Sequence, residues 1–283
     1  MSSFRQTIFR LTAGFWLALL PAAVQAEGFV LGIGAEGDSS DGRAFSALGD
    51  FSVGGKSWIS FTASAAETQG IIQDNQTVLG DLSFDHFFEP VGIRIGAAYW
   101  GNSDILDSRD INGSLYVRGK AGSLSANFEQ RKFEFDLQSD LLQGRTAKFS
   151  ADGWGLSARL SLGERVNLYL GGMVYDYSRN LRIQPDIDAL AFISRSRLSM
   201  INNLIDDRFN VGVEFKFGLR SVDVTAGQWQ TAIDGSTIDS YSIGFLTPFT
   251  DRTDAEIRFS YDESEVYGRT TAVSFYLYYF GGT

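Results

Sequence analysis

The sequence of 283 residues has no cysteine, one histidine and only 4 prolines. Without cysteine the chain can form no disulfide, hold no iron–sulfur cluster or cysteine zinc site, and carry no lipid on a cysteine. Basic residues are also scarce, since 24 Lys and Arg stand against 34 Asp and Glu. This balance excludes nucleic acid as a partner, because binding the phosphate backbone requires a basic surface.

After its first 26 residues the chain also lacks any run of about 18 apolar residues, the length that a transmembrane helix needs. What it has instead is an aromatic content of 14% and 31 glycines. A chain so rich in Phe and Tyr can bury enough apolar surface to order itself, which argues against intrinsic disorder.

The N-terminus has the pattern of a secretory signal peptide. Arg5 and Arg10 supply the positive charge, and a short apolar run follows them. The small residues near position 26 suit cleavage after Ala26. An uncleaved membrane anchor is the alternative, but the run is too short to span a bilayer easily. The sequence therefore predicts a signal peptide at 1–26 and one domain at 27–283.

The rest of the chain alternates between apolar and polar residues with period two. Ile93 and Ile95, for example, alternate with Gly92 and Arg94. This alternation is typical of a β-strand with two unlike faces. Segments of this kind lie near residues 28–36, 43–53, 57–66, 75–87, 91–100, 110–118, 123–135, 147–161, 166–176, 207–217, 221–231, 237–246, 253–261 and 270–280.

The connections between these segments are alternately short and generally longer. A soluble β-sandwich also alternates, but its strands are usually about five or six residues long. The segments here have the roughly nine to eleven residues of a tilted membrane-spanning strand. The arrangement resembles the outer-membrane β-barrels of Gram-negative bacteria, which have short periplasmic turns and longer external loops. The resemblance implies an all-β fold, a transmembrane antiparallel up-and-down β-barrel of about 14 strands, with both termini in the periplasm.

Two further features add to this resemblance. Aromatic residues collect at segment ends, where a barrel has its interfacial girdles: Trp58, Phe88, Tyr99, Trp100, Tyr175, Tyr177, Phe217, Phe249, Tyr261 and Tyr267. The last segment looks like the strand that the barrel-assembly machinery reads, although three residues follow it; this assembly signal is Phe275, Tyr276, Leu277, Tyr278, Tyr279 and Phe280. The resemblance also implies outer-membrane lipid and lipopolysaccharide as partners, and a monomer.

Three motifs suggest chemistry at first sight. Residues 32–37 match a dinucleotide-binding fingerprint, but no helix follows them, so room inside a barrel wall is the better interpretation of the glycines. His86 lies close to a short turn and is expected to be an interfacial residue, not the base of a hydrolase. Asp104, Asp107 and Asp110 share one predicted loop, where solvated carboxylates are favoured over an aspartate-based protease. The sequence predicts no catalytic residue, no metal and no cofactor.

The connection 177–206 is far longer than the others, and such loops are usually functional or disordered. Pro185 and Asp186 favour the start of a helix, after which apolar residues recur with helical spacing. The sequence predicts a short helix that constricts the lumen, caps its mouth or lies on the outer leaflet. The first two are favoured because an apolar stripe seeks burial. The candidate constriction or gating residues are Arg179, Arg182, Arg195 and Arg197.

The polar face of the alternation predicts the wall of the lumen. The predicted lumen-lining residues are Asp81, Arg94, Arg118, Asn127, Glu129, Arg159, Glu214, Lys216, Asp223, Glu256 and Arg258. A barrel of about 14 strands is wide enough for a narrow pore, although opposite charges pairing across the lumen could close it. Because acidic and basic residues balance in this set, we expect only a weak ion preference.

The leading hypothesis is a passive, weakly selective channel for small polar solutes across the outer membrane. The first alternative is a non-conducting structural or receptor barrel, or a partner subunit of an envelope export complex. The second is a hydrolase at the outer leaflet, which is the least favoured, so no enzymatic activity is predicted.

Overall fold

The computed structural model describes residues 28–69, 74–102, 106–137, 145–181, 204–266 and 268–282. The predicted signal peptide lies outside these residues, as do most of the predicted loop helix, Arg182, Arg195, Arg197, Asp104 and Tyr267. Within these ranges no helix is long and apolar enough to cross a membrane.

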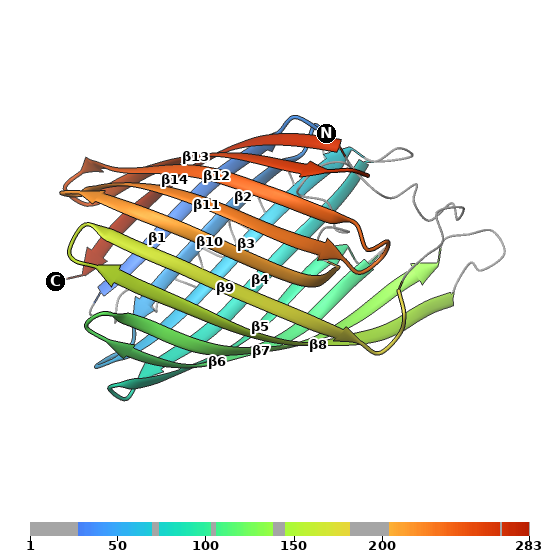
Figure 1. Ribbon diagram of the computed structural model, residues 1–283, viewed down its shortest axis with the longest axis horizontal. Coiled ribbons are helices and arrows are strands. Elements are labelled where there is room, and N and C mark those ends of the chain that lie inside the picture. The colour runs from blue at the N-terminus through green and yellow to red at the C-terminus, as the bar shows by residue number, and fades with distance from the viewer. Residues whose placement is uncertain are drawn as a thin grey trace.

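The described residues form fourteen antiparallel strands that close into one barrel (Figure 1). Each strand pairs with its neighbours in sequence, and β14 pairs with β1 to close the ring, so every strand has a partner on both sides. The strands are β1 (Gly28–Asp38), β2 (Arg43–Ser52), β3 (Ser57–Gln69), β4 (Asp74–Phe87), β5 (Val91–Asn102), β6 (Leu106–Gly119), β7 (Gly122–Leu137), β8 (Arg145–Leu162), β9 (Val166–Tyr177), β10 (Ile205–Phe217), β11 (Arg220–Thr231), β12 (Thr237–Thr250), β13 (Thr253–Ser264) and β14 (Gly268–Gly282).

Each of the fourteen predicted segments is a strand, and the up-and-down order is confirmed. The strands differ from the prediction mainly in length. β6 begins at Leu106, inside a stretch predicted to be a loop, because Leu106 still pairs with Phe135 of β7. Likewise β8 begins at Arg145, which pairs with Leu137. Backbone pairing therefore continues past the point where the apolar outward alternation stops.

The two ends of the barrel differ in their connections, and we call them the short-turn end and the long-loop end. At the short-turn end, the β2–β3 turn passes through Gly54 (φ 108°) and Gly55 (φ 58°), and the β10–β11 turn through Gly218 (φ 68°). Glycine adopts this left-handed region without steric cost, which suits tight turns. Next to the first turn, the Lys56 ammonium donates a hydrogen bond to Glu89 and lowers the pKa of that carboxyl.

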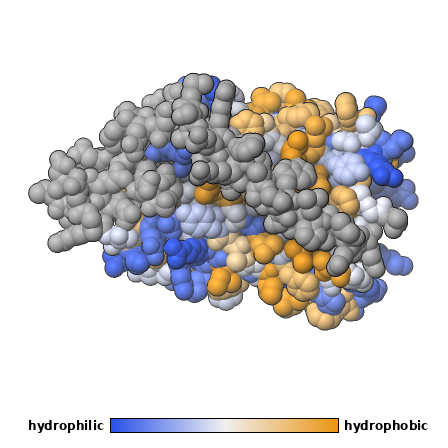
Figure 2. All heavy atoms as spheres, turned by 180° about the vertical axis from the view of Figure 1, so that it is seen from behind, coloured by the Kyte–Doolittle hydropathy of each residue, from blue (hydrophilic) through white to orange (hydrophobic). Residues whose placement is uncertain are grey.

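Outward-facing apolar side chains form a belt around the barrel near the short-turn end. Leu82, Ile95, Leu115 and Leu156 are each more than half exposed, with 64% for Leu156. Figure 2 shows hydrophobic residues gathered in a band on one face of the barrel, with hydrophilic residues on both sides of it. A continuous apolar surface of this kind suits contact with lipid and not with water. The belt also includes Ile33, Phe84, Ile93, Val117, Leu124, Leu160, Leu168, Leu170, Val211, Val224, Phe245, Ile257, Phe259, Val273 and Phe275.

Toward the long-loop end the two faces exchange character. The outward positions of β7 and β8 now carry exposed polar residues such as Lys132, Lys148 and Asp152. The inward positions of the same strands carry Phe133 and Ala151, each only 1% exposed. On β7 and β8 the barrel is therefore apolar outside and polar inside near the short turns, and the reverse near the long loops.

The inward apolar residues near the long-loop end pack into what we call the aromatic cluster. Its buried members are Trp100, Leu106, Phe133, Ala151, Met173, Tyr175, Leu204 and Ile233, with Leu79, Phe135, Phe149, Tyr177 and Ile205 packed against them. Phe133 stacks on Phe149 with ring centroids 4.7 Å apart. The prediction that Trp100, Tyr175 and Tyr177 belong to an outer girdle is therefore wrong, because these rings face inward and find an apolar core there. Phe88, Phe217 and Phe249 are exposed at the short-turn end, as a girdle requires.

Candidate functional site: the barrel lumen

The register of the strands shows which side chains share the lumen face, because directly opposed residues on antiparallel strands point the same way. Arg94 of β5 pairs with Asp85 on one side and Ser114 on the other, and Ser114 pairs with Asn127. Ser114 Oγ also donates a hydrogen bond to Asn127 Oδ1 at 2.9 Å. By the same register and alternation, the residues predicted to line the lumen all lie at inward positions: Asp81, Arg94, Arg118, Asn127, Glu129, Arg159, Glu214, Lys216, Asp223, Glu256 and Arg258.

One group of charges on the lumen wall centres on Arg258 of β13. Its Nη2 lies 2.6 Å from Asp223 Oδ1 of β11 and 3.0 Å from Glu256 Oε1. The contact with Asp223 passes over β12, where Gly244 lies between the two strands. A Cβ at position 244 would come within 2.1 Å of Asp223 Oδ2. The absence of a side chain at Gly244 is therefore what gives the arginine room to reach its partner.

A second group centres on Glu214 of β10. Its Oε2 accepts hydrogen bonds from Asn167 Nδ2 and Tyr169 OH, both at 2.7 Å, and lies 3.6 Å from the Arg159 guanidinium. The Arg159 guanidinium in turn lies over the Tyr169 ring, 5.0 Å from its centroid. These contacts hold both ends of the ion pair against the wall formed by β8, β9 and β10.

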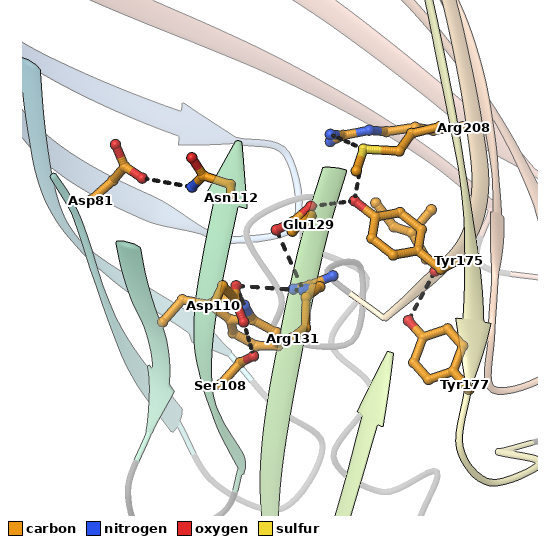
Figure 3. Close-up of polar contacts among 12 residues, drawn as sticks. Asp81, Ser108, Asp110, Asn112, Glu129, Arg131, Tyr175, Tyr177 and Arg208 are labelled. Atoms are coloured by element: carbon orange, nitrogen blue, oxygen red, sulfur yellow. Dashed lines mark hydrogen bonds and ion pairs between the residues drawn. The ribbon is translucent and has the colours of Figure 1, made fainter. Parts of the chain in front are cut away.

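A third group lies at the boundary between the polar lumen and the aromatic cluster (Figure 3). Arg131 Nε lies 3.4 Å from Asp110 Oδ2 and 3.8 Å from Glu129 Oε1. Its guanidinium lies 5.0 Å to 5.6 Å from the ring centroids of Phe133, Trp100 and Tyr175. With only 5% exposure, Arg131 is held by carboxylates on one side and aromatic rings on the other.

The partners of Arg131 are themselves fixed by hydrogen bonds. Asp110 accepts from Ser108 and, at 3.1 Å, from Trp100 Nε1, and Glu129 accepts from Tyr175 OH at 2.6 Å. These hydrogen bonds hold the two carboxylates in one arrangement beside Arg131. Figure 3 shows Arg208 beside this network, where its Nη2 lies 3.5 Å from the Met173 sulfur.

The middle of the lumen contains a cavity of about 700 Å³. Its inward-facing lining is dominated by hydroxyl, amide and glycine positions with a few charges: Arg94, Asn112, Ser114, Asn127, Glu129, Ser157, Gly171, Met173, Arg208, Asn210, Thr225, Gly227, Trp229, Ser240 and Ser242. Such a surface can solvate small polar molecules with donors and acceptors that exchange readily with water.

The ion pairs of these three groups run along the barrel wall. Arg258 and Asp223 are two strands apart, as are Arg159 and Glu214, whereas Arg131 and Asp110 lie on adjacent strands. Pairs of this length do not bridge the diameter of a barrel of fourteen strands. These charges therefore stabilise the wall. They do not pair across the lumen, which the alternative interpretation of the sequence would require.

The structure also brings charged residues to the lumen that the sequence prediction omitted. The omitted acidic residues are Glu36, Asp50, Asp85, Asp110, Asp254 and Asp262, and the omitted basic residues are Arg131 and Arg208. The alternation along each strand could have identified them, because residues separated by an even number of positions face the same side of the sheet. Arg131, for instance, lies two residues after Glu129 and so faces the same way.

The other predicted functional residues are placed as follows. Arg179 follows β9 at the long-loop end and is exposed. In the assembly signal, Tyr276 and Tyr278 face inward, and Tyr278 OH donates to Glu256 at 2.8 Å. Gly34 of the glycine-rich motif faces Tyr276, and a Cβ there would lie 2.2 Å from its ring. The interpretation of that motif as room within a barrel wall is thus confirmed.

The residues weighed for catalysis do not form a catalytic group. Ser57 Oγ and His86 Nδ1 are 2.7 Å apart on the outward face, where the imidazole packs against Phe88. Asp107 and Asp110 lie on opposite faces of β6, so they do not act together. Among the residues that the structure describes, no three His, Cys, Asp or Glu side chains are placed to share a metal ion.

No protein-family model matches the chain, and no curated protein is matched by its sequence. Solved structures do match. The CymD monoaromatic hydrocarbon channel superposes with a TM-score of 0.54 at 10% identity, over 92% of this chain and 89% of CymD. Acinetobacter baumannii OccAB4 gives a TM-score of 0.47 at 7% identity, over 90% and 97% of the two chains. The KdgM porin gives 0.45 at 7% identity, over 88% and 98%.

At these identities the comparison shows a similar fold only, and the evidence for that similarity is the match to CymD. The likeness to CymD extends over most of both chains and so covers the barrel as a whole. The chain is a fourteen-stranded antiparallel β-barrel whose fold is similar to that of CymD.

Proposed function

We propose that the protein is a passive channel for small polar solutes across the outer membrane. One observation carries the proposal: a polar cavity of about 700 Å³ lies inside a closed barrel whose outer surface is an apolar belt. The belt provides a surface for lipid, and the cavity provides a path that polar solutes can enter. The structural likeness to CymD, which is named as a channel, supports the same function.

We propose an orientation in which the short-turn end faces the periplasm. Residue Gly28 at the start of β1 pairs with Gly282 at the end of β14, so both ends of the barrel sequence meet at the short-turn end. A signal peptide at 1–26 would then direct export, and the residues Phe275–Phe280 in β14 would be read by the barrel-assembly machinery. In this assignment the barrel is a monomer in outer-membrane lipid and lipopolysaccharide, without enzymatic activity.

The test is conductance of the purified protein in planar lipid bilayers. Discrete current steps are expected from wild-type protein whose β-rich circular dichroism shows that it is folded. Ser157→Trp places a large ring at the cavity and should reduce the step size, because Ser157 lines it. Leu156→Trp is the matched control, since the neighbouring Leu156 faces outward in the belt and the step size should stay unchanged. Folded wild-type protein that never conducts would contradict the channel.

We also propose that the loop between β9 and β10 narrows the lumen. The support is its length and the helical spacing of its apolar residues, together with Arg179, Arg182, Arg195 and Arg197. Deleting residues 180–203 should increase the conductance of each open channel. Conductance equal to that of the full chain would reject the loop as a constriction and leave the channel itself standing.

A further inference from the structure

The inward-facing charges are not mixed evenly around the ring. The strands β5–β10 form an arc that carries nearly all the inward cations, and we call it the basic arc: Arg94, Arg118, Arg131, Arg159, Arg208 and Lys216. The remaining strands, β11–β14 and β1–β4, are contiguous through the β1–β14 pair and form the acidic arc: Glu36, Asp50, Asp81, Asp85, Asp223, Asp254, Glu256 and Asp262.

On the basic arc, two of the six named cations form ion pairs with carboxylates of the same arc. Arg131 pairs with Asp110 and Glu129, and Arg159 pairs with Glu214. Arg94 pairs at the boundary between the arcs, where its Nε lies 3.3 Å from Asp85 Oδ2. The three carboxylates of the basic arc, Asp110, Glu129 and Glu214, thus cancel part of the charge of its six named cations at short range.

The acidic arc is different, because Arg258 is its one inward-facing cation among the residues that the structure describes. This arginine already serves two carboxylates, Asp223 and Glu256. The same arc also carries Asp50, Asp81, Asp254, Glu36 and Asp262, which are not ion-pair partners of Arg258. The acidic arc therefore carries an excess of negative charge along the length of the lumen.

This excess acts where screening is weakest. A charge next to a low-dielectric wall and a narrow column of water is screened less than one on an open surface, and the field is focused into the channel. The Debye length is about 8 Å at physiological ionic strength, which is large enough for the carboxylates of one arc to act together. Mobile cations would accumulate along the acidic arc, and mobile anions would be depleted.

We propose that the lumen selects for cations and amine-bearing solutes, which pass along the acidic arc opposite the basic and aromatic wall. The inference rests on the proposed channel function and names its solute class. It replaces the weak ion preference expected from the sequence, because that expectation weighed a balanced set of charges without their positions around the ring. The carboxylates Asp50, Asp81 and Asp254 are its specificity-determining residues.

The test is the reversal potential of the full-length protein in bilayers across a KCl gradient. The wild-type permeability ratio of K⁺ to Cl⁻ should be well above one. The triple variant Asp50→Asn, Asp81→Asn and Asp254→Asn should bring this ratio close to one. A matched control, Asp152→Asn with Asp176→Asn and Asp239→Asn, removes the same charge from outward positions near the long-loop end and should leave the ratio at its wild-type value.

Solute flux gives a second readout that does not depend on salt. In liposome swelling assays, 1,4-diaminobutane should enter faster than succinate through the wild-type protein, and the triple variant should lose this difference. Channels that conduct with no cation preference, or a ratio that falls equally in the control, would overturn the inference while leaving the channel intact. Folded protein without any conductance would overturn both proposals.

Discussion

The belt near the short turns and the region near the long loops are built by the same strands with the same alternation, yet their faces are opposite. Leu156 in the belt points outward and is 64% exposed, whereas Phe133 near the long loops points inward and is 1% exposed. In a strand the side-chain period is always two, so only the surroundings decide which face is apolar. The belt is suited to lipid, whereas on β7 and β8 the region beyond it has an apolar interior and a polar exterior.

This difference teaches that one barrel can have two kinds of core. At the belt the apolar side chains face outward and the lumen is polar, so in the proposed membrane location lipid takes the place of a core. Near the long loops, the aromatic cluster supplies a conventional packed core on the lumen side of β5–β9. The basic arc and the aromatic cluster share these strands, so the lumen is bulky on one wall and acidic on the other.

The difference between the two regions is tested most strongly by replacing one large side chain with alanine in each region. Phe133→Ala should destabilise the barrel by about 3–5 kcal/mol, because it leaves a cavity in a packed core. Phe259→Ala in the belt should cost much less, because Phe259 is 45% exposed toward lipid, which can fill the space. Urea-induced unfolding in lipid bilayers measures both. Equal losses for the two variants would contradict the distinction between a protein core and a lipid-covered surface.

Removing one arginine from the buried network and one from the lumen wall should change the stability of the barrel by different amounts. Arg131→Met should cost about 3–5 kcal/mol, because it leaves the buried Asp110 and the partly buried Glu129 without their cation. Arg258→Met should cost about 1 kcal/mol or less, since its side chain is 30% exposed and its carboxylate partners can be hydrated. The same unfolding assay gives both values. If Arg258→Met proved the more damaging, the lumen near the short turns would have to be drier than we propose.

Placing a charge on the outside tests the comparison from the lipid side. Leu156→Arg should cost about 2–4 kcal/mol if that position lies near the bilayer midplane. Gln130→Arg, at an outward position of the adjacent strand toward the long loops, should change stability by less than about 0.5 kcal/mol. Unfolding from bilayers measures the difference between the two variants. An arginine tolerated at position 156 would show that the belt does not face lipid.

Much of the fold could be predicted from the sequence, because each strand is recognisable from the alternation of apolar and polar residues along it. The alternation around Ile93 and Arg94 marks both the strand and its two faces, and the register then places Arg94 on the lumen side. The same parity covers residues that the prediction omitted, such as Asp85 and Arg131. The alternation does not reveal which of the two faces points outward. For this reason the predicted outer position of Trp100 and Tyr175 is wrong.

By itself, the sequence determined the number of strands, their order and the parity of each side chain, because these depend on local alternation and on short turns. Only the tertiary structure decided where the faces exchange character, which carboxylate each arginine reaches, and how charge is divided around the lumen. Arg258 meets Asp223 across β12, and Asp50 shares an arc with Asp254 because β14 closes on β1. The first relation follows from the pairing of the consecutive strands β11, β12 and β13, whereas the second requires the ring to close through β14 and β1.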